Sequence, residues 1–292
     1  MQLWKLCFPH DTQRFIRFYF ERVYVGEQTL VLLKGGRPVA ALQMIPYRLK
    51  MWSSLARAHE GSLEGSSGSS LVWGGYISGA MTHPGHRRKG YMAQLLEAAF
   101  GRMRERGYAF SFLIPQGERL IDYYGRFGFE RAFAQHTACY NCLTTGAVPD
   151  GNIKVHAALS PVDLPALYAV YSAYLMKKSS AVLKSEQQFS NILWDFFDEG
   201  GILFAGDGGL AFTYKKRNKV VVTEFFYRDT AARTEFLQAA GAYYSAAEVV
   251  VVDDPAAPVS GFKGMIRPLA APLAPLAPLA PPTDIYMGPM LE

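Results

Sequence analysis

Apolar residues in the first 142 positions follow two different periods. Alternating or continuous apolar runs predict strands at residues 29–34, 38–44, 47–52, 71–82 and 108–115. Residues 92–103 instead repeat apolar positions every three to four residues, which predicts an amphipathic helix ending at Gly107. Further helices are predicted at 11–24 and 118–126, and an extended stretch at 129–141. This order of elements predicts an α/β fold, a mixed sheet with flanking helices.

The second half of the chain shows a similar order of elements after a polar linker near residues 144–151. Its patterns predict helices after Pro161 and at 185–199 and 231–245, and strands at 202–205, 210–215, 220–227 and 248–252. From Pro268 to Pro282 a Pro-Leu-Ala repeat predicts polyproline II, and the apolar character of the last ten residues predicts a short docking strand. The expected domains are residues 1–145 and 146–267, followed by an arm and docking segment at 268–292.

The composition excludes several classes of protein. Of the 292 residues 50% are hydrophobic and 19% are charged, so most of the chain is expected to fold into ordered cores. Neither an apolar run of 18 residues nor a signal-peptide pattern occurs, which predicts a soluble, cytoplasmic protein without a membrane partner. The formal net charge of +5 comes without long basic runs, so no nucleic-acid partner is expected. His136, Cys139 and Cys142 lack a second ligand pair, and no metal is expected.

The most basic segment, His86-Arg87-Arg88-Lys89-Gly90, lies between a predicted strand and the amphipathic helix. A helix N-terminus has unpaired backbone N–H groups and the positive end of the helix dipole, and both favour an anion. Arg87, Arg88 and Lys89 add positive charge there, and Gly90 lets a ligand approach the backbone. The segment suits a pyrophosphate group. The alternative is a solvated basic turn at the start of a surface helix.

The run Arg87-Arg88-Lys89-Gly90-Tyr91-Met92 resembles the Arg/Gln-x-x-Gly-x-Gly/Ala acetyl-CoA signature of the GCN5-related N-acetyltransferases, the GNAT superfamily. The order His-Arg-Arg-Lys-Gly is most similar to the enhanced-intracellular-survival (Eis-like) branch, in which two acetyltransferase-type domains lie in tandem. Met92 departs from the small residue of the signature, and Ala93 follows it directly. The resemblance implies that acetyl-CoA is bound by Ala80, Met81, Thr82, Arg87, Arg88, Lys89, Gly90, Tyr91, Met92 and Ala93.

A second element of the resemblance begins at Asp122-Tyr123-Tyr124-Gly125 and continues through Phe129. It is similar to the Tyr-x-x-x-Gly-Phe segment of the superfamily, whose tyrosine serves as the general acid. The resemblance therefore implies that Tyr124 protonates the CoA thiolate that the reaction releases. The alternative is that Tyr123 and Tyr124 are ordinary core aromatics.

The second half lacks a basic glycine turn, and Asp229-Thr230-Ala231-Ala232-Arg233 stands where the signature would be expected. We expect residues 146–267 to form a degenerate, non-catalytic acetyltransferase-like domain. Two roles stay open for this domain, closing one wall of the acceptor pocket or acting as a scaffold.

The resemblance implies an acetyl-CoA-dependent N-acetyltransferase that acts on a primary amine by direct attack in a ternary complex. The alternatives are a non-catalytic acyl-CoA-binding or regulatory protein, and an interaction module that presents the proline arm. The acceptor is a small-molecule or peptide amine. Aminoglycosides, polyamines, peptide N-termini and lysine all stay open, and so does a homo-oligomeric state.

The general base is a separate question, because an alkylammonium acceptor must lose a proton before it attacks. In the Eis-like branch the terminal carboxylate reaches the active site, which implies this role for Glu292. The 15 residues from Pro268 to Pro282 would span roughly 45 Å as polyproline II, enough to cross a small domain. The alternative is that the last residues only dock as an edge strand or fray.

Overall fold

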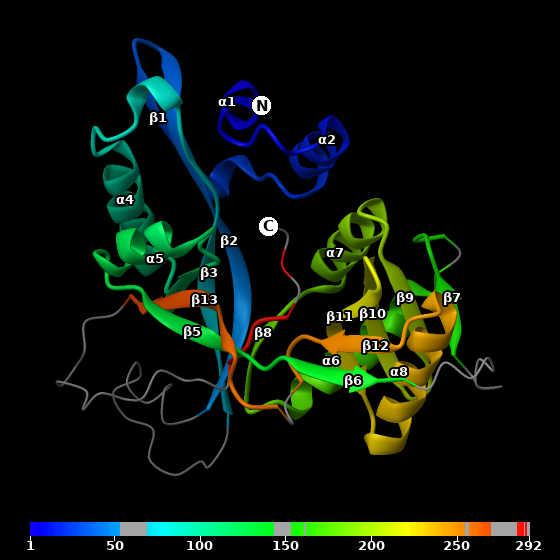
Figure 1. Ribbon diagram of the computed structural model, residues 1–292. Coiled ribbons are helices and arrows are strands. Elements are labelled where there is room, and N and C mark those ends of the chain that lie inside the picture. The colour runs from blue at the N-terminus through cyan, green and yellow to red at the C-terminus, as the bar shows by residue number, and fades with distance from the viewer. Residues whose placement is uncertain are drawn as a thin grey trace, which may run out of the picture. The chain divides into compact units, whose positions relative to one another are not determined.

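The computed structural model describes residues 1–52, 69–142, 153–160, 162–254, 257–269, 285–288 and 290 (Figure 1). These residues form two compact units. Unit 1 contains the described residues of 1–132 together with 264–269, and unit 2 contains those of 133–263 together with 285–288 and 290. Both units combine a sheet with helices, as the α/β prediction requires. The linker near 144–151 and most of the proline arm lie outside the described residues.

Unit 1 is built on a mixed sheet in the order β1–β2–β3–β4–β13–β5. Its strands are β1 (Thr29–Lys34), β2 (Arg37–Trp52), β3 (Ser69–Thr82), β4 (Phe110–Leu113), β13 (Gly261–Pro268) and β5 (Glu130–Gln135). The pairs β1–β2, β2–β3 and β4–β13 are antiparallel, whereas β3 and β4 are parallel. The runs expected as separate strands at 38–44 and 47–52 form the single strand β2, which continues through Pro46 opposite Gly75.

The helices of unit 1 lie on both faces of this sheet, as Figure 1 shows. They are α1 (Gln2–Cys7), α2 (Gln13–Arg22), α4 (Tyr91–Glu105) and α5 (Glu118–Gly125), with 3-10 turns η1 (Gly26–Gln28) and η2 (Pro84–His86). The apolar face of α4 packs with Leu42 and Met44 of β2. Trp4 of α1 and Tyr19 of α2 pack instead with Ala41, whose side chain points the other way along the strand.

A bulge interrupts the pairing of β2 with β3 near the end of β3, where the register shifts between Ala41 and Gln43. Gly79 lies at this point with a φ of +56°, and a Cβ there would lie 2.8 Å from Cζ3 of Trp4. The hydroxyl of Tyr19 donates to Oε1 of Gln43 at 2.8 Å and lies 2.8 Å from Oγ of Ser78. Glycine is therefore required at the bulge by both backbone conformation and space.

Unit 2 has a six-stranded sheet in the order β6–β12–β11–β10–β9–β7. Its strands are β6 (Ala138–Asn141), β12 (Glu248–Val251), β11 (Lys219–Tyr227), β10 (Gly209–Lys216), β9 (Ile202–Gly206) and β7 (Lys154–His156). The predicted meander is confirmed, because β9, β10 and β11 are sequential antiparallel neighbours. The extended stretch expected at 129–141 is divided into β5 and β6.

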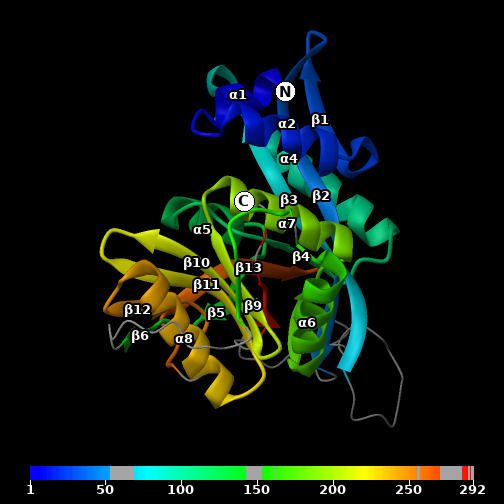
Figure 2. The ribbon, with the colours of Figure 1, turned by 90° about the vertical axis from the view of Figure 1, so that its right-hand side faces the viewer.

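Among the residues described in unit 2, three helices cover the sheet, namely α6 (Leu164–Lys177), α7 (Glu186–Asp198) and α8 (Thr230–Tyr244). α6 and α7 pack on the face that carries Leu210 and Phe212 of β10, and α8 packs on the face that carries Ala211. In Figure 2, α6 lies on one side of these strands and α8 on the other. The side chain of Ser185 accepts a hydrogen bond from the backbone N–H of Gln188 in a capping box that begins α7.

The C-terminal residues dock inside unit 2. Strand β14 (Ile285–Tyr286) pairs in parallel with β8 (Ser180–Leu183). The hydroxyl of Tyr286 donates to Glu224, a carboxylate that is only 2% exposed, and Lys263 donates to the carbonyl of Gly288 at 3.1 Å. Nζ of Lys184 donates to the carbonyls of Val182 and Met287.

Burial lowers the pKa of Lys184 to about 7, and the nearby Glu224 carboxylate opposes this shift. The pKa of the folded state thus lies below that of an unfolded lysine, about 10.4. Between pH 7 and 10 the unfolded chain therefore binds more protons, and the free energy of unfolding of unit 2 is expected to rise with pH, by at most ~1.4 kcal/mol per pH unit. Urea unfolding at pH 7, 8, 9 and 10 measures this slope. Lys184→Met is expected to flatten it and the exposed Lys216→Met to retain it; equal slopes in both variants would contradict this assignment.

Candidate functional site

The N-terminus of α4 is open to a ligand. Gly90 is its N-cap residue with a φ of +78°, and no side chain caps the helix. A Cβ built on Gly90 would have no heavy atom within 4 Å. The first N–H groups of α4 therefore lack side-chain acceptors, and the positive end of the helix dipole faces open space.

Basic side chains surround this helix start. Nε of Arg87 donates to the carbonyl of Thr82 at 3.2 Å, and Nζ of Lys89 donates to the carbonyl of Gly85 at 3.3 Å. Arg87, Arg88 and Lys89 are all exposed, and none of them forms an ion pair within the described chain. Nζ of Lys34, from the hairpin between β1 and β2, donates to the hydroxyl of Tyr91 at 3.1 Å. Positive charge thus gathers where an anion is already favoured.

The strands β3 and β4 separate beside this helix start. They pair in parallel only from Gly74 to Tyr76 on β3, opposite 110–112 on β4. β3 continues to Thr82 and stays paired with β2 as far as that residue. The segment after the bulge consists of Ala80, Met81 and Thr82. One edge of this segment faces β2, and the other edge is not paired with β4. This edge offers backbone hydrogen-bonding groups to a ligand that lies between β3 and β4.

Tyr124 lies on α5 and belongs to the same apolar cluster as Ile77 of β3 and Leu95 of α4. Ala80 and Met92 pack against that cluster as well. The Tyr124 side chain is 7% exposed, and within the described chain its hydroxyl forms no hydrogen bond. Burial raises the pKa of Tyr124 to about 12, with a smaller contribution from Tyr123. The phenol is therefore protonated at neutral pH and can donate a proton.

The structure brings most of the expected site residues into unit 1. Ala80, Met81 and Thr82 end β3, the basic residues form the following turn, and Tyr91, Met92 and Ala93 form the first turn of α4. Glu292 lies outside the described residues. Within the part of the chain that the structure describes, no group of three His, Cys, Asp or Glu side chains can hold a metal ion. The same residues contain no helix long and apolar enough to cross a membrane.

The corresponding helix of unit 2, α8, begins differently. Asp229 caps it, and its carboxylate accepts a hydrogen bond from the N–H of Ala232 at 2.9 Å. This hydrogen bond and the neighbouring Arg228 lower the pKa of Asp229. The N-terminus of α8 therefore already carries a negative charge, which disfavours a second anion.

The strands of unit 2 also separate, since β11 pairs with β12 only from Lys219 to Val222 and continues to Tyr227. Arg233 of α8 forms an ion pair with Asp254 and a hydrogen bond with Tyr140 in this region. Asp254 is 1% exposed, so the pair is buried at the carboxylate end. Arg233 near the start of α8 is thus paired within unit 2, whereas Arg87, Arg88 and Lys89 near the start of α4 form no ion pair within the described chain.

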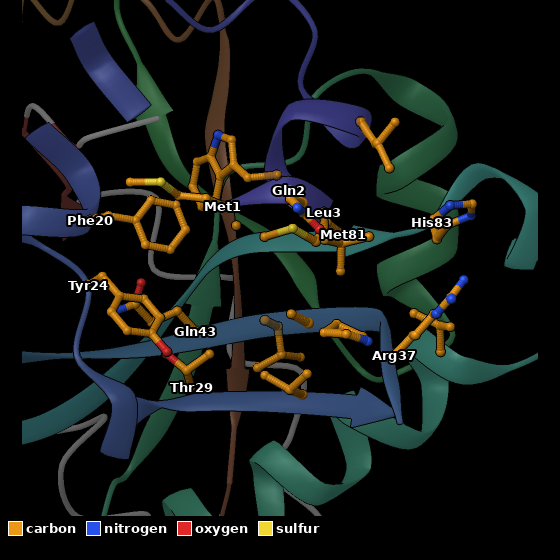
Figure 3. Close-up of a pocket in the computed structure, with 18 of the residues that line it drawn as sticks. Met1, Gln2, Leu3, Phe20, Tyr24, Thr29, Arg37, Gln43, Met81 and His83 are labelled. Carbon is orange, nitrogen blue, oxygen red and sulfur yellow. The ribbon is translucent and has the colours of Figure 1, made fainter. Parts of the chain in front are cut away.

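No local pattern in the sequence predicts a large cavity in unit 1. A pocket of about 1010 Å³ lies between α1, the end of α2 and the strands β1, β2 and β3 (Figure 3). Gly79 and Met81 line it, so it shares strand β3 with the candidate site. The aromatic residues of α2 could have indicated a surface that another element covers. Helix α1 could not be predicted, because it has only six residues and no N-terminal side-chain cap.

Comparisons with known proteins identify an acetyltransferase-type domain in the part of unit 1 that contains the start of α4. The family described as acetyltransferase (GNAT) domain matches residues 62–132, a range that includes β3, α4, β4 and α5. No curated protein matches the sequence significantly.

Several solved structures share the fold. A GCN5-related N-acetyltransferase from Kribbella flavida has a TM-score of 0.66 at 16% identity, covering 91% of this chain and 66% of that one. A conserved protein from Enterococcus faecalis, described as a probable N-acyltransferase, has a TM-score of 0.67 at 13% identity, with 92% and 68% covered. Eis1 from Mycobacterium abscessus has a TM-score of 0.62 at 14% identity, with 92% and 70% covered. The chain thus spans about two thirds of the length of these proteins. Residues 62–132 thus match the acetyltransferase (GNAT) domain family, and the chain as a whole shares the fold of these structures.

Proposed function

We propose that the chain transfers the acetyl group of acetyl-CoA to a primary amine, by direct attack of the amine on the thioester in a ternary complex. The observation that carries this proposal is the start of α4, which has no side-chain cap and lies beside basic side chains that form no ion pair within the described chain. The N–H groups of this helix turn, with Arg87, Arg88 and Lys89, bind the CoA pyrophosphate. The fold shared with Eis1 supports the resemblance to the Eis-like branch.

The edge of β3 holds the thioester end of the cosubstrate. Ala80, Met81 and Thr82 present backbone groups where β3 has separated from β4. Hydrogen bonds from this backbone orient the thioester carbonyl and stabilise the charge that develops on its oxygen during attack. Tyr91, Met92 and Ala93 form the first turn of α4, and Tyr91 and Met92 pack against the same apolar cluster as Ala80.

Tyr124 supplies the proton for the leaving group. The amine nitrogen forms a bond to the carbonyl carbon, the carbon–sulfur bond breaks, and the phenol proton passes to the thiolate. Burial keeps the phenol protonated at neutral pH, so its proton is available when the thiolate leaves. We propose Glu292 as the base that accepts the amine proton, on the resemblance alone.

Unit 2 has no acetyl-CoA site in this proposal. The Asp229 carboxylate at the start of α8 and the Arg233–Asp254 pair support a non-catalytic role. Such a unit stabilises the fold or forms part of the acceptor site.

The test is a thiol-release assay with acetyl-CoA and a panel of amines that contains an aminoglycoside, spermidine, a lysine peptide and an aromatic monoamine. Release of CoA that depends on one of these amines supports the proposal, and mass spectrometry of the acetylated product identifies the reacting nitrogen. Binding of acetyl-CoA without release for any amine class would instead indicate the non-catalytic acyl-CoA-binding protein.

A further inference from the structure

The pocket between α1 and β2, called here the α1–β2 pocket, has two chemically different ends. Figure 3 shows Phe20 and Tyr24 at one end and Arg37 and His83 at the other. Its volume of about 1010 Å³ is at the upper end of the range of small-molecule sites. This asymmetry restricts the kind of ligand that the pocket can hold.

The aromatic end is apolar and held in place by contacts behind it. The rings of Phe20 and Tyr24 lie 5.1 Å apart, and those of Trp4 and Phe20 lie 5.7 Å apart. Nε1 of Trp4 donates to Oδ2 of Asp11 at 2.6 Å, which fixes the indole. The polar residues Gln43 and Thr29 also lie here. The amide of Gln43 is already used by Tyr19 and by the carbonyl of Val23, and the hydroxyl of Thr29 donates to the carbonyl of Val25 at 2.8 Å. An apolar ligand body therefore meets hydrophobic rings without displacing a hydrogen bond.

The other end carries donors that lack acceptors. Nδ1 of His83 accepts a hydrogen bond from the N–H of Gly85 at 3.1 Å, so Nε2 is the nitrogen that can donate. Nδ1 of His86 is buried without a hydrogen-bond partner. Arg37 is exposed and forms no ion pair within the described chain. None of the described residues that line the pocket is Asp or Glu. A cationic ligand would find no counter-charge here, whereas an anionic group would find several donors.

We propose that the α1–β2 pocket binds a small amphipathic carboxylate, with its apolar body against Trp4, Phe20 and Tyr24 and its carboxylate at Arg37 and His83. Burial of the apolar body provides most of the binding free energy, and the carboxylate fixes the orientation. The side chain of Met81 packs with Trp4 beside this pocket, whereas the acetyl-CoA contact proposed above is made by the backbone of Met81, so the inference does not depend on acetyl transfer.

The experiment measures binding by isothermal titration calorimetry to the full chain, below the micelle concentration of each probe. The probes are decanoate, decyltrimethylammonium and decanol, which share a ten-carbon chain and differ in charge. Decanoate is expected to bind at least about tenfold more tightly than decyltrimethylammonium, because charge-assisted hydrogen bonds form with only one of them. Equal affinities of the two charged probes in the unmodified protein would overturn the proposal without the use of any variant.

A variant locates the site. Arg37→Gln with His83→Gln is expected to weaken decanoate binding at least about tenfold while decanol binding changes little. Arg119→Gln, at an exposed arginine of α5, is the matched control and is expected to bind decanoate normally. Saturating CoA is expected to leave decanoate binding unchanged. Displacement of decanoate by CoA, or full affinity in the double variant, would show that the carboxylate does not bind at this place.

Discussion

Tyr124→Phe is expected to lower kcat for acetyl transfer by about 10²–10⁴, while the Kd for acetyl-CoA stays nearly unchanged. The variant removes only the hydroxyl, which forms no hydrogen bond within the described chain, so the packing of the ring against Tyr123 and Phe129 is retained. Steady-state thiol release gives kcat, and calorimetry gives the Kd. Since burial raises the pKa of Tyr124 to about 12, ionisation of this phenol is not expected to reduce kcat between pH 7 and 10.

Tyr123→Phe is the matched control for this prediction. Tyr123 is the neighbouring tyrosine of α5, and its ring centroid lies 5.4 Å from that of Tyr124. This variant is expected to keep its kcat within a few-fold of the unmodified value. Full turnover in Tyr124→Phe, or an equal loss in both variants, would remove Tyr124 as the specific proton donor.

Replacing Arg87 and Arg88 together by alanine is expected to raise the Kd for acetyl-CoA at least about tenfold. Charge-assisted hydrogen bonds to phosphate contribute roughly 1.5–3 kcal/mol each, and both side chains lie free of ion pairs beside the start of α4. Calorimetry at two salt concentrations measures the effect, which is expected to shrink at high salt because exposed charges are screened. The midpoint of thermal unfolding is expected to change little, since the apolar face of α4 is unaltered.

Arg102→Ala with Arg104→Ala removes the same charge from the last turn of α4, where both side chains are exposed. If the phosphate contact is local, this control binds acetyl-CoA like the unmodified protein. A similar loss of affinity in both double variants would mean that net charge rather than the helix start determines binding.

The elements with strong local patterns were predictable from the sequence. The helix expected at 92–103 lies within α4 because its apolar residues cover one face, and Leu96, Ala99 and Phe100 are fully buried there. The strands at 202–205, 210–215 and 220–227 were found for the same reason, since turn residues separate them. The basic turn was recognisable because its residues are contiguous in the sequence.

Features that depend on distant residues were not predictable. A short docking strand was expected in the last ten residues, and β14 lies there, but its partner β8, about 100 residues earlier in the chain, was not expected. The bulge at Gly79 depends on Trp4, and no local pattern connects these two positions. The α1–β2 pocket is formed by residues from several separate elements, so its volume and its two ends emerge only when the chain has folded.

The pairing of β13 with β4 affects how unit 1 folds while the ribosome synthesises the chain. Arg267 pairs with Ser111 of β4, which is made about 155 residues earlier. At a translation rate of about 5–20 residues per second, β13 is synthesised roughly 8–30 s after β4, and until then β4 lacks its neighbouring strand on that side. During that time an apolar strand edge is open to solvent, and such edges are sites where nascent chains aggregate or bind chaperones. We therefore expect unit 1, most of which is synthesised first, to complete its folding only after β13 has been synthesised.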